Sequence, residues 1–335
     1  MLVSYILKRI LQMIPMLIAV SILIFFIIKL PPGDFLTTYV AQLKLNGNVV
    51  SESTIINLKK QYGLDKSDTQ QYFIWIKNII TRGDFGTSFQ WSQPVADLIK
   101  PRIGWTMVVS LTTLLISFLV AIPVGIYAAT HKYSLGDYIV SFIGFIGMAT
   151  PGFLLALVVI YLIFVNTGVA FTGLFSDAFA TAPWSMAKFI DMLPRLGLCI
   201  GIIGLTGTAG TIRTMRAMTL DELEKQYVTT ARSKGLKEND MLFKYPIRMA
   251  INPIVSTIGW ALPAFISGEI VVSIVLSMPT IGPLLRRAFM VQDTFVAGSI
   301  MLFTAVLTVI GTLISDILLA MLDPRIRFGG VTDNE

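Results

Sequence analysis

Side chains able to act as nucleophiles, bases or metal ligands are scarce in this sequence. It has one cysteine, Cys199, and one histidine, His131, among 335 residues. So few ligands cannot build a zinc site, a disulfide framework or a cysteine–histidine couple within one chain. Cys199 lies in an apolar run and is predicted to be a small packing residue. His131, beside Lys132 at the end of a hydrophobic segment, is predicted to lie at an interface. No metal site and no catalytic residue are expected.

The motifs of two enzyme classes are also missing. The sequence has no Gly-x-x-x-x-Gly-Lys-Ser/Thr loop for nucleotide phosphates, and no His-Glu-x-x-His motif or paired aspartates within its apolar segments. The glycine-rich stretch 201–210 is apolar and has no following lysine. We predict that this stretch permits close packing of helices. An intramembrane enzyme is therefore disfavoured, and any nucleotide hydrolysis must belong to another polypeptide.

Polar residues inside apolar segments are the remaining candidates, because hydrocarbon penalises them. The apolar segments supply essentially one clear acid, Glu269. It would meet a cationic substrate group or an arginine of a partner chain, or it simply lies near the membrane interface. The candidate hydroxyls are Thr206, Thr208, Thr211, Ser256, Thr257 and Ser267. Such hydroxyls either line a substrate path or bond to their own backbone or a neighbouring helix.

Composition determines the class of protein that holds these residues. Hydrophobic residues make up 54% of the chain and charged residues 14%, against about 45–50% and 25% in soluble domains. A soluble fold cannot bury so much apolar surface, and disorder requires the opposite composition. The net charge of +6 is distributed as in a membrane topology rather than as a nucleic-acid patch. The chain is therefore predicted to be an all-α polytopic membrane protein.

Six apolar runs are long enough to cross a bilayer as helices. They are Ile10–Leu30, Trp105–Ala129, Tyr138–Val165, Leu193–Ile212, Ile254–Leu276 and Ala297–Leu322. The first run is too long for a signal peptide and has no cleavage site after it, so it is predicted to be a retained span. Prolines inside the runs indicate a packed bundle, in which neighbouring helices satisfy the freed carbonyls; these are Pro15, Pro123, Pro151 and Pro263.

The distribution of Lys and Arg predicts the orientation of these spans. Basic residues precede the first span, follow the second, follow the sixth, and are concentrated between the fourth and fifth. With six spans, all four segments fall on one side, so both termini are predicted to be cytoplasmic. Arg286 and Arg287 oppose this trend but are outnumbered. The resulting organisation is a first segment and span at 1–30, an extracytoplasmic segment at 31–104, a membrane core at 105–322 and a cytoplasmic tail at 323–335.

The extracytoplasmic segment contains one clear helical pattern. Residues Thr69–Thr81 form an amphipathic helix in this prediction, with Ser67 or Asp68 as its cap and Gly83 as its end. Its apolar stripe comprises Tyr72, Phe73, Ile76, Ile79 and Ile80. The segment either covers the membrane bundle as a small cap or contacts a partner directly. A second outside loop, 166–191, carries Pro183 and Trp184 and is a candidate interfacial segment.

The longest cytoplasmic loop, 214–252, has the most informative pattern. Thr219 to Glu222 matches a capping box, which predicts a helix from Leu220 to Lys234 that ends at Gly235. A second helix is expected to begin near Asn239 or Asp240. A short amphipathic helix here lies on lipid, packs under its own bundle, or docks into a partner. Small residues at 231 and 233 favour close approach to another surface.

The same loop resembles a known family. The stretch from Tyr227 to Leu236, with Asn252-Pro253 further on, resembles the signature loop of permease subunits of binding-protein-dependent ABC importers, in the oligopeptide/dipeptide/nickel branch. The family's Glu-Ala-Ala triplet corresponds to Thr229, Thr230 and Ala231, so the acid is absent here. Further resemblances to this branch occur in the expected order along nearly the whole chain, at 5–9, 32–34, 82–88, 149–151, 277–282 and 323–327.

This resemblance implies a function and a set of partners. It implies a type I permease fold in a bacterial or archaeal cell membrane, in which the loop forms a coupling helix resting in a cleft of a cytoplasmic ATPase. The implied coupling residues are Tyr227, Thr229, Thr230, Ala231, Arg232, Gly235 and Leu236. The implied partners are a homologous second permease, two ATPase subunits that bind ATP and Mg, an extracytoplasmic binding protein and membrane lipid. Peptide relatives often place an acid about one turn after Glu269, where this chain has Ser273, so that acid does not carry over directly. The candidate path residues are Glu269, Ser273, Ser267 and Thr208.

Two questions remain open from the sequence. The resemblance implies oligopeptides as cargo, with oligosaccharides as a close alternative, because similar permeases are associated with both. A secondary transporter driven by an ion gradient is a rival from another class. Such a protein requires discontinuous helices and buried ionisable residues coupled to ion movement, and no inverted repeat is evident in this sequence.

Overall fold

The computed structural model describes residues 2–31, 33, 35–37, 40, 52–61 and 63–322. Within these residues the regular structure is α-helical, apart from one isolated β-bridge between Thr87 and Pro94. This confirms the predicted all-α class. The predicted tail 323–335 and most of the segment 31–51 lie outside the described residues.

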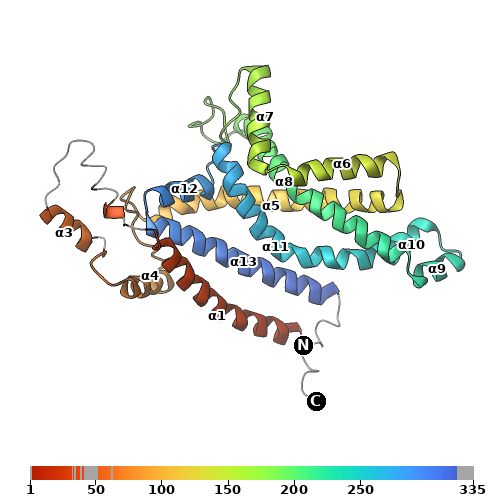
Figure 1. Cartoon of the computed structure of the whole chain (residues 1–335), viewed down its shortest axis with the longest axis horizontal. Coiled ribbons are helices and arrows are strands. Elements are labelled where there is room, and N and C mark those ends of the chain that lie inside the picture. Colours follow the sequence, from red (N-terminus) through yellow and green to blue (C-terminus); the bar gives the residue numbers. More distant parts are fainter. Residues whose placement is uncertain are drawn as a thin grey trace, which may run out of the picture. The chain divides into compact units, whose positions relative to one another are not determined.

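The described helices follow one another along the chain as labelled in Figure 1. They are α1 (Leu2–Ile28), α3 (Glu52–Gln61), α4 (Asp68–Arg82), α5 (Val95–Thr130), α6 (Leu135–Ala149), α7 (Gly152–Thr167), α8 (Met186–Leu223), α9 (Gln226–Ser233), α10 (Glu238–Lys244), α11 (Pro246–Val275), α12 (Ile281–Met290) and α13 (Thr294–Leu322).

The chain divides into two compact units. The first contains residues 1–10, 107–278 and 308–335, and the second contains residues 11–106 and 279–307. The first unit holds α6 to α11, which include the predicted coupling loop 214–252 and most of the candidate path residues. The second holds α3, α4 and α12, which are mainly extracytoplasmic in the predicted topology.

The described helices include fewer complete spans than the six predicted from sequence. Four are long and apolar enough to cross a membrane, within α1, α5, α8 and α13, and the bent pair α6–α7 raises the number to five if it counts as one span. Within α11 the apolar segment found is Ala264–Val275, which is shorter than a span, and the side chains at 259, 260, 262 and 263 lie outside the described part. The structure therefore supports four or five spans.

The third predicted span, 138–165, is not a straight helix. The chain bends by 103° between α6 and α7. Thr150 is extended there, with φ −96° and ψ 120°, because the ring of a following proline disfavours helical backbone at the residue before it. Pro151 then begins α7 without a backbone N–H to donate. The sequence prediction placed Pro151 inside a continuous span, and the structure corrects this.

The first unit is built around α8. This helix packs against α6, α7 and α11, and α8 and α11 run side by side in Figure 1. Gly125 of α5 lies so close to α8 that an added Cβ would be 2.6 Å from the Met215 Cβ. Gly207 meets the Phe265 ring in the same way, at 2.6 Å. Small residues allow helices to approach closely in a membrane, and this confirms close packing for part of the stretch 201–210. Cys199 is fully buried in α8, as predicted for a packing residue.

The ends of α1 and α13 are joined by an ion pair in the first unit. Arg9 Nε lies 3.4 Å from Asp316 Oδ2. Asp316 is a second acid within a predicted span, which the sequence analysis overlooked when it named essentially Glu269 alone. An intramembrane acid is tolerated when a basic partner is within reach, and Arg9 is such a partner.

In the second unit, α4 forms as predicted but its buried face differs. Ser67 caps the helix and Gly83 ends it with φ +64°. Tyr72 and Trp75 are buried against Phe25 of α1, whereas two members of the predicted stripe, Phe73 and Ile80, are 66% and 77% exposed. Trp75 takes the inward position because it lies three residues after Tyr72, on the same face of the helix. Within this unit, one face of α4 therefore packs against α1 and the opposite face is exposed.

Candidate coupling loop and translocation groove

The loop predicted to be cytoplasmic forms two short helices, α9 and α10, at the end of α8. A buried cluster holds them to their own bundle: Met215, Val228, Ala231, Met241, Leu242, Ile247, Ala250 and Ile254. The opposite face of α9 is exposed and includes Tyr227, Thr229, Thr230 and Arg232. Leu236 and Gly235, after the helix, are exposed as well. Of the seven predicted coupling residues, Ala231 alone is buried, so it fixes α9 to this chain rather than presenting a small surface to a partner.

The start of this coupling element differs from the sequence prediction. Thr219 is buried inside α8 and does not cap a helix, and α8 continues to Leu223. A capping hydroxyl requires an extended backbone at its own residue, and the extended residue here is Lys225, which precedes α9. The predicted single helix 220–234 is therefore wrong. The second helix begins at Glu238, close to the predicted position.

Polar side chains bridge the break between α8 and α9. Lys225 Nζ lies 2.5 Å from a carboxylate oxygen of Glu222, and the Tyr227 hydroxyl donates to the other oxygen. Burial and the Glu222 carboxylate raise the pKa of Tyr227 above its usual range. The hydroxyl thus keeps its proton at neutral pH and remains a donor. These contacts connect the first turn of α9 to the last turn of α8.

The end of α9 is a glycine turn. Gly235 has φ +75°, its N–H donates to Arg232 O at 2.9 Å, and the Leu236 N–H donates to Ala231 O at 3.4 Å. This is the Schellman arrangement, which requires a left-handed residue. Arg232 also pairs with Glu238 across the turn at 2.6 Å, which lowers the pKa of the Glu238 carboxyl. Gly235 therefore has the left-handed backbone conformation that the sequence predicted.

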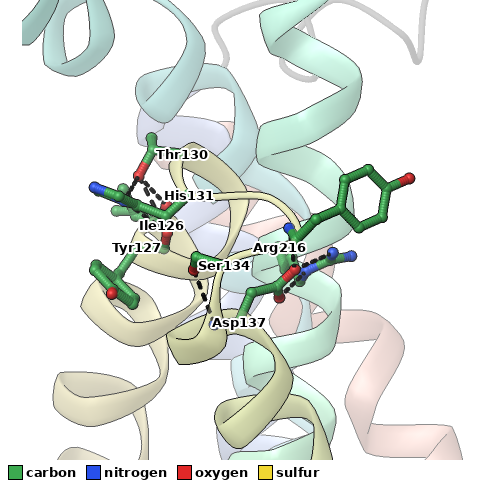
Figure 2. Close-up of polar contacts among 8 residues, drawn as sticks. Ile126, Tyr127, Thr130, His131, Ser134, Asp137 and Arg216 are labelled. Carbon is green, nitrogen blue, oxygen red and sulfur yellow. Dashed lines mark hydrogen bonds and ion pairs between the residues drawn. The ribbon is translucent and has the colours of Figure 1, made fainter.

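An ion pair connects the last third of α8 to the first turn of α6. Arg216 donates from Nε to Asp137 Oδ1 at 2.7 Å and from Nη2 to Oδ2 at 2.8 Å. The Tyr133 N–H donates to the same carboxylate, and the Asp137 N–H donates to the Ser134 hydroxyl. Figure 2 shows Arg216 reaching from α8 toward Asp137 while Ser134 lies at the start of α6. Asp137 is 3% exposed.

Sequence reasoning missed this pair. Arg216 was counted only as a cytoplasmic charge, and Asp137 had no assigned role. The two residues are 79 positions apart, so no helical periodicity relates them. His131 lies nearby with its ring stacked on Tyr127 at 4.5 Å (Figure 2), and its Nδ1 lies 3.1 Å from the Thr130 hydroxyl. Its local contacts are those of a loop-end residue.

A cavity of about 510 Å³ lies between α5, α8 and α11 in the first unit. Its wall combines small residues, hydroxyls and apolar side chains: Phe118, Ile203, Thr206, Gly207, Gly210, Thr211, Thr214, Ile254, Thr257, Ala261, Ala264, Phe265 and Gly268. Thr206, Thr211 and Thr257 therefore line it, and each donates its hydroxyl to a carbonyl of its own helix. We call this cavity the groove.

The four predicted path residues, Glu269, Ser273, Ser267 and Thr208, are not among the residues that line the groove. Glu269 and Ser273 are fully buried, and Ser267 is exposed. Thr208 is half-buried on the α8 face that carries Gly204, beside Thr113 and Ser117 of α5. Gly268, next to Glu269, does line the groove. The lining glycines and alanines were not predicted as path residues, because only polar side chains were considered for the path and the glycines of 201–210 were assigned to helix packing.

Comparison with known proteins covers almost the whole chain. Residues 121–328 match the family described as "Binding-protein-dependent transport system inner membrane component", and residues 1–112 match its N-terminal family. The oligopeptide transport system permease protein AppB of Bacillus subtilis is 34% identical over 97% of this chain and 99% of its own. A putative peptide permease of Brucella ovis is 31% identical over 96% and 98%. The peptidoglycan transport system permease protein YejB of Agrobacterium fabrum is 30% identical over 97% and 98%.

These matches agree with the apolar helices and with the absence of nucleotide-binding motifs from the sequence. Two family models together extend over most of the chain, and the relatives align from end to end. The chain belongs to the binding-protein-dependent transport inner membrane component family and is a non-catalytic, membrane-embedded permease subunit of an ABC importer.

Proposed function

We propose that this permease carries oligopeptides delivered by an extracytoplasmic binding protein. The observation that carries the proposal is the end-to-end similarity to the oligopeptide permease AppB. In the proposed assembly the chain pairs with a homologous second permease and stands on two cytoplasmic ATPase subunits. ATP and Mg are bound by those ATPases. The alternative cargo is an oligosaccharide, and the ligand bound by the binding protein distinguishes the two.

The exposed face of α9 is the proposed contact with an ATPase. Closure of the ATPases would move α9, and the movement would pass to α8 through Glu222, Lys225 and Tyr227. Arg216 would carry it further to α6 through Asp137. Packed helices shift as rigid bodies between discrete arrangements. Such a shift would alternate the groove between outward-facing and inward-facing states.

The chemistry of the groove suits a cargo of variable side chains. No charged side chain is among the lining residues in the described part of the chain. Threonine hydroxyls already donate to their own helices and keep an acceptor lone pair for a peptide N–H. A transport path must bind weakly enough for the cargo to leave. Selectivity would then belong mostly to the binding protein.

The decisive experiment uses the assembled transporter in proteoliposomes with its binding protein. Ligand released from the purified binding protein would be identified by mass spectrometry, and uptake of that ligand measured with and without ATP. Bound peptides and ATP-dependent uptake are expected. Bound oligosaccharides would replace peptides as the cargo. Uptake by the isolated permease on a proton gradient would overturn the proposal.

Gly268→Leu tests whether the groove is the path. Among the described residues, no atom lies within 4 Å of a Cβ added at Gly268, and Gly268 lines the groove. Leucine should therefore fill part of the groove without disturbing α11. In a transport state in which the groove closes around residue 268, the added side chain should raise the free energy by about 1–3 kcal/mol. We expect ATP-driven uptake to fall about five- to hundredfold. Gly201→Leu is the control, because Gly201 is equally open and does not line the groove. Equal uptake by the two variants would count against the groove.

Glu269→Gln tests the acidic path residue separately. Glu269 is fully buried in this conformation, so cargo can reach it only in a state in which the surrounding helices separate. If the carboxylate meets the cationic amino terminus of a peptide, the variant should raise KM for free peptides and leave N-acetylated peptides unchanged. Kinetics measured in proteoliposomes would show this difference. Unchanged KM for both peptides would remove Glu269 from the path.

A further inference from the structure

The second unit contains a cavity of about 420 Å³ that the transport mechanism does not use. It lies between α4, the start of α5 and the outer part of α13. Ile79 comes from α4, Ile99 and Ile103 from α5, and Leu302 and Phe303 from α13. All of the described lining residues are apolar except Lys100 and Ser299. The cavity is therefore suited to a hydrocarbon chain rather than to a polar cargo.

Lys100, near the start of α5, contributes a charged group to the wall of the cavity. Lys100 is exposed and lies five residues after the start of α5 at Val95. The 36 residues of α5 extend over roughly 54 Å, which exceeds the bilayer including its headgroups, about 40–45 Å. The first turns of α5 thus reach headgroup level. A flexible lysine stem lies along apolar surface while its ammonium group stays among the headgroups.

The opposite end of the cavity lies deeper. Val306 is on its wall and is twelve residues after Thr294, the first residue of α13, or roughly 18 Å along the helix. In the predicted topology α5 and α13 both run inward from the extracytoplasmic side. The cavity thus changes from charged to apolar in the direction in which a phospholipid changes from headgroup to acyl chain.

Two further observations favour lipid as the occupant. Phe73 and Ile80 on the outer face of α4 are 66% and 77% exposed, and Lys77 lies between them on that face. An amphipathic helix of this kind lies in the headgroup–acyl boundary. The Ser299 hydroxyl, on the cavity wall, has no hydrogen-bond partner among the described residues, and an ester carbonyl of a lipid would supply an acceptor.

We propose that this cavity binds one acyl chain of a phospholipid of the outer leaflet, whose phosphate is held by Lys100. Since an acyl chain is already in hydrocarbon when it is in the bilayer, the chain contributes packing rather than a hydrophobic gain. Preference for an anionic headgroup must come from Lys100, and a lysine near charged headgroups changes the affinity by about fivefold. The site would fix α4 against α5 and α13.

The test is native mass spectrometry of the complete transporter, purified in mild detergent and supplied with phosphatidylglycerol of known mass. The wild type should retain one such lipid on this permease. Ala96→Trp, which fills the cavity, should abolish retention, and Lys100→Gln should weaken it about fivefold. The controls Ile80→Trp and Lys77→Gln change exposed α4 residues outside the cavity and should retain the lipid. Retention by Ala96→Trp equal to the wild type would overturn the proposal.

A second measurement detects the lipid directly and does not rely on loss of binding. Phe303→benzoylphenylalanine extends a cavity-lining phenylalanine ring by a photoreactive benzoyl group that reaches into the cavity. Irradiation of the transporter in membranes should attach phospholipid, detected as a mass increase of the peptide that contains residue 303. A crosslink to a second permease or to the binding protein instead would show that a protein covers this cavity, and it would refute the lipid site.

Discussion

Replacing Gly235 by valine is expected to uncouple ATP hydrolysis from uptake while leaving the permease inserted in the membrane. Gly235 has φ +75°, where a non-glycine residue is strained by about 1–3 kcal/mol and a β-branched one is least tolerated. Relief of that strain would break the bonds from Gly235 N–H to Arg232 O and from Leu236 N–H to Ala231 O. The C-terminal end of α9, which carries part of the proposed ATPase contact, would then no longer be held in place. ATPase activity and uptake, measured together in proteoliposomes, report the coupling.

Gly235→Asn separates strain from crowding. Asparagine adopts the left-handed conformation more readily than other residues with a side chain, and no atom of the described residues lies within 4 Å of a Cβ added at Gly235. Strain alone therefore predicts near-normal coupling for the asparagine variant. Loss of coupling with asparagine as well would mean that an ATPase surface approaches the glycine closely. Normal coupled transport by the valine variant would count against α9 as the coupling element.

The second large effect is expected from the ion pair between Asp137 and Arg216. Asp137 is 3% exposed and accepts two hydrogen bonds from Arg216. Removing one partner of a fully buried pair costs about 3–5 kcal/mol. Because the Arg216 side chain is 27% exposed and the Tyr133 N–H still donates to Asp137, we expect a cost of about 3 kcal/mol or less. Arg216→Ala should therefore lower the thermal stability of the purified transporter and reduce the amount of complex in the membrane. It should also reduce uptake per ATP hydrolysed, since α6, although still packed against α8, loses the ion pair that fixes its first turn to that helix.

Three variants make this prediction specific. Arg213→Ala removes an exposed arginine one turn earlier on α8 and should have little effect. Arg216→Lys keeps the charge but loses the two parallel hydrogen bonds, so it should recover part of the stability and less of the coupling. The exchange of both residues, Asp137→Arg with Arg216→Asp, should restore stability in part. Equal losses from Arg213→Ala and Arg216→Ala would show that the pair has no special role.

In the coupling loop, the local sequence pattern predicted the end of one helix correctly, whereas tertiary packing determined where that helix begins. The glycine turn at Gly235 was predictable because its cause is local: the backbone conformation excludes most side chains. The start of the preceding helix was not, because Thr219 matched a capping box yet is buried in α8. Packing of α8 against its neighbours outweighed the small free energy that one cap contributes. The same holds for α4, whose ends were predicted correctly and whose buried face was not.

Composition and periodicity determined by themselves that this chain is an all-helical membrane protein, and the ordered motifs indicated its family. Only the tertiary structure decided which side chains meet. Asp137 and Arg216 are 79 positions apart, and the groove is formed by glycines, alanines and threonines of separate helices. Apolar patterns predict that a helix inserts into the membrane and which stretch of the chain it comprises, because insertion depends on the transfer of side chains from water to lipid. Contacts between helices depend on shape and on close approach, which a single sequence does not record.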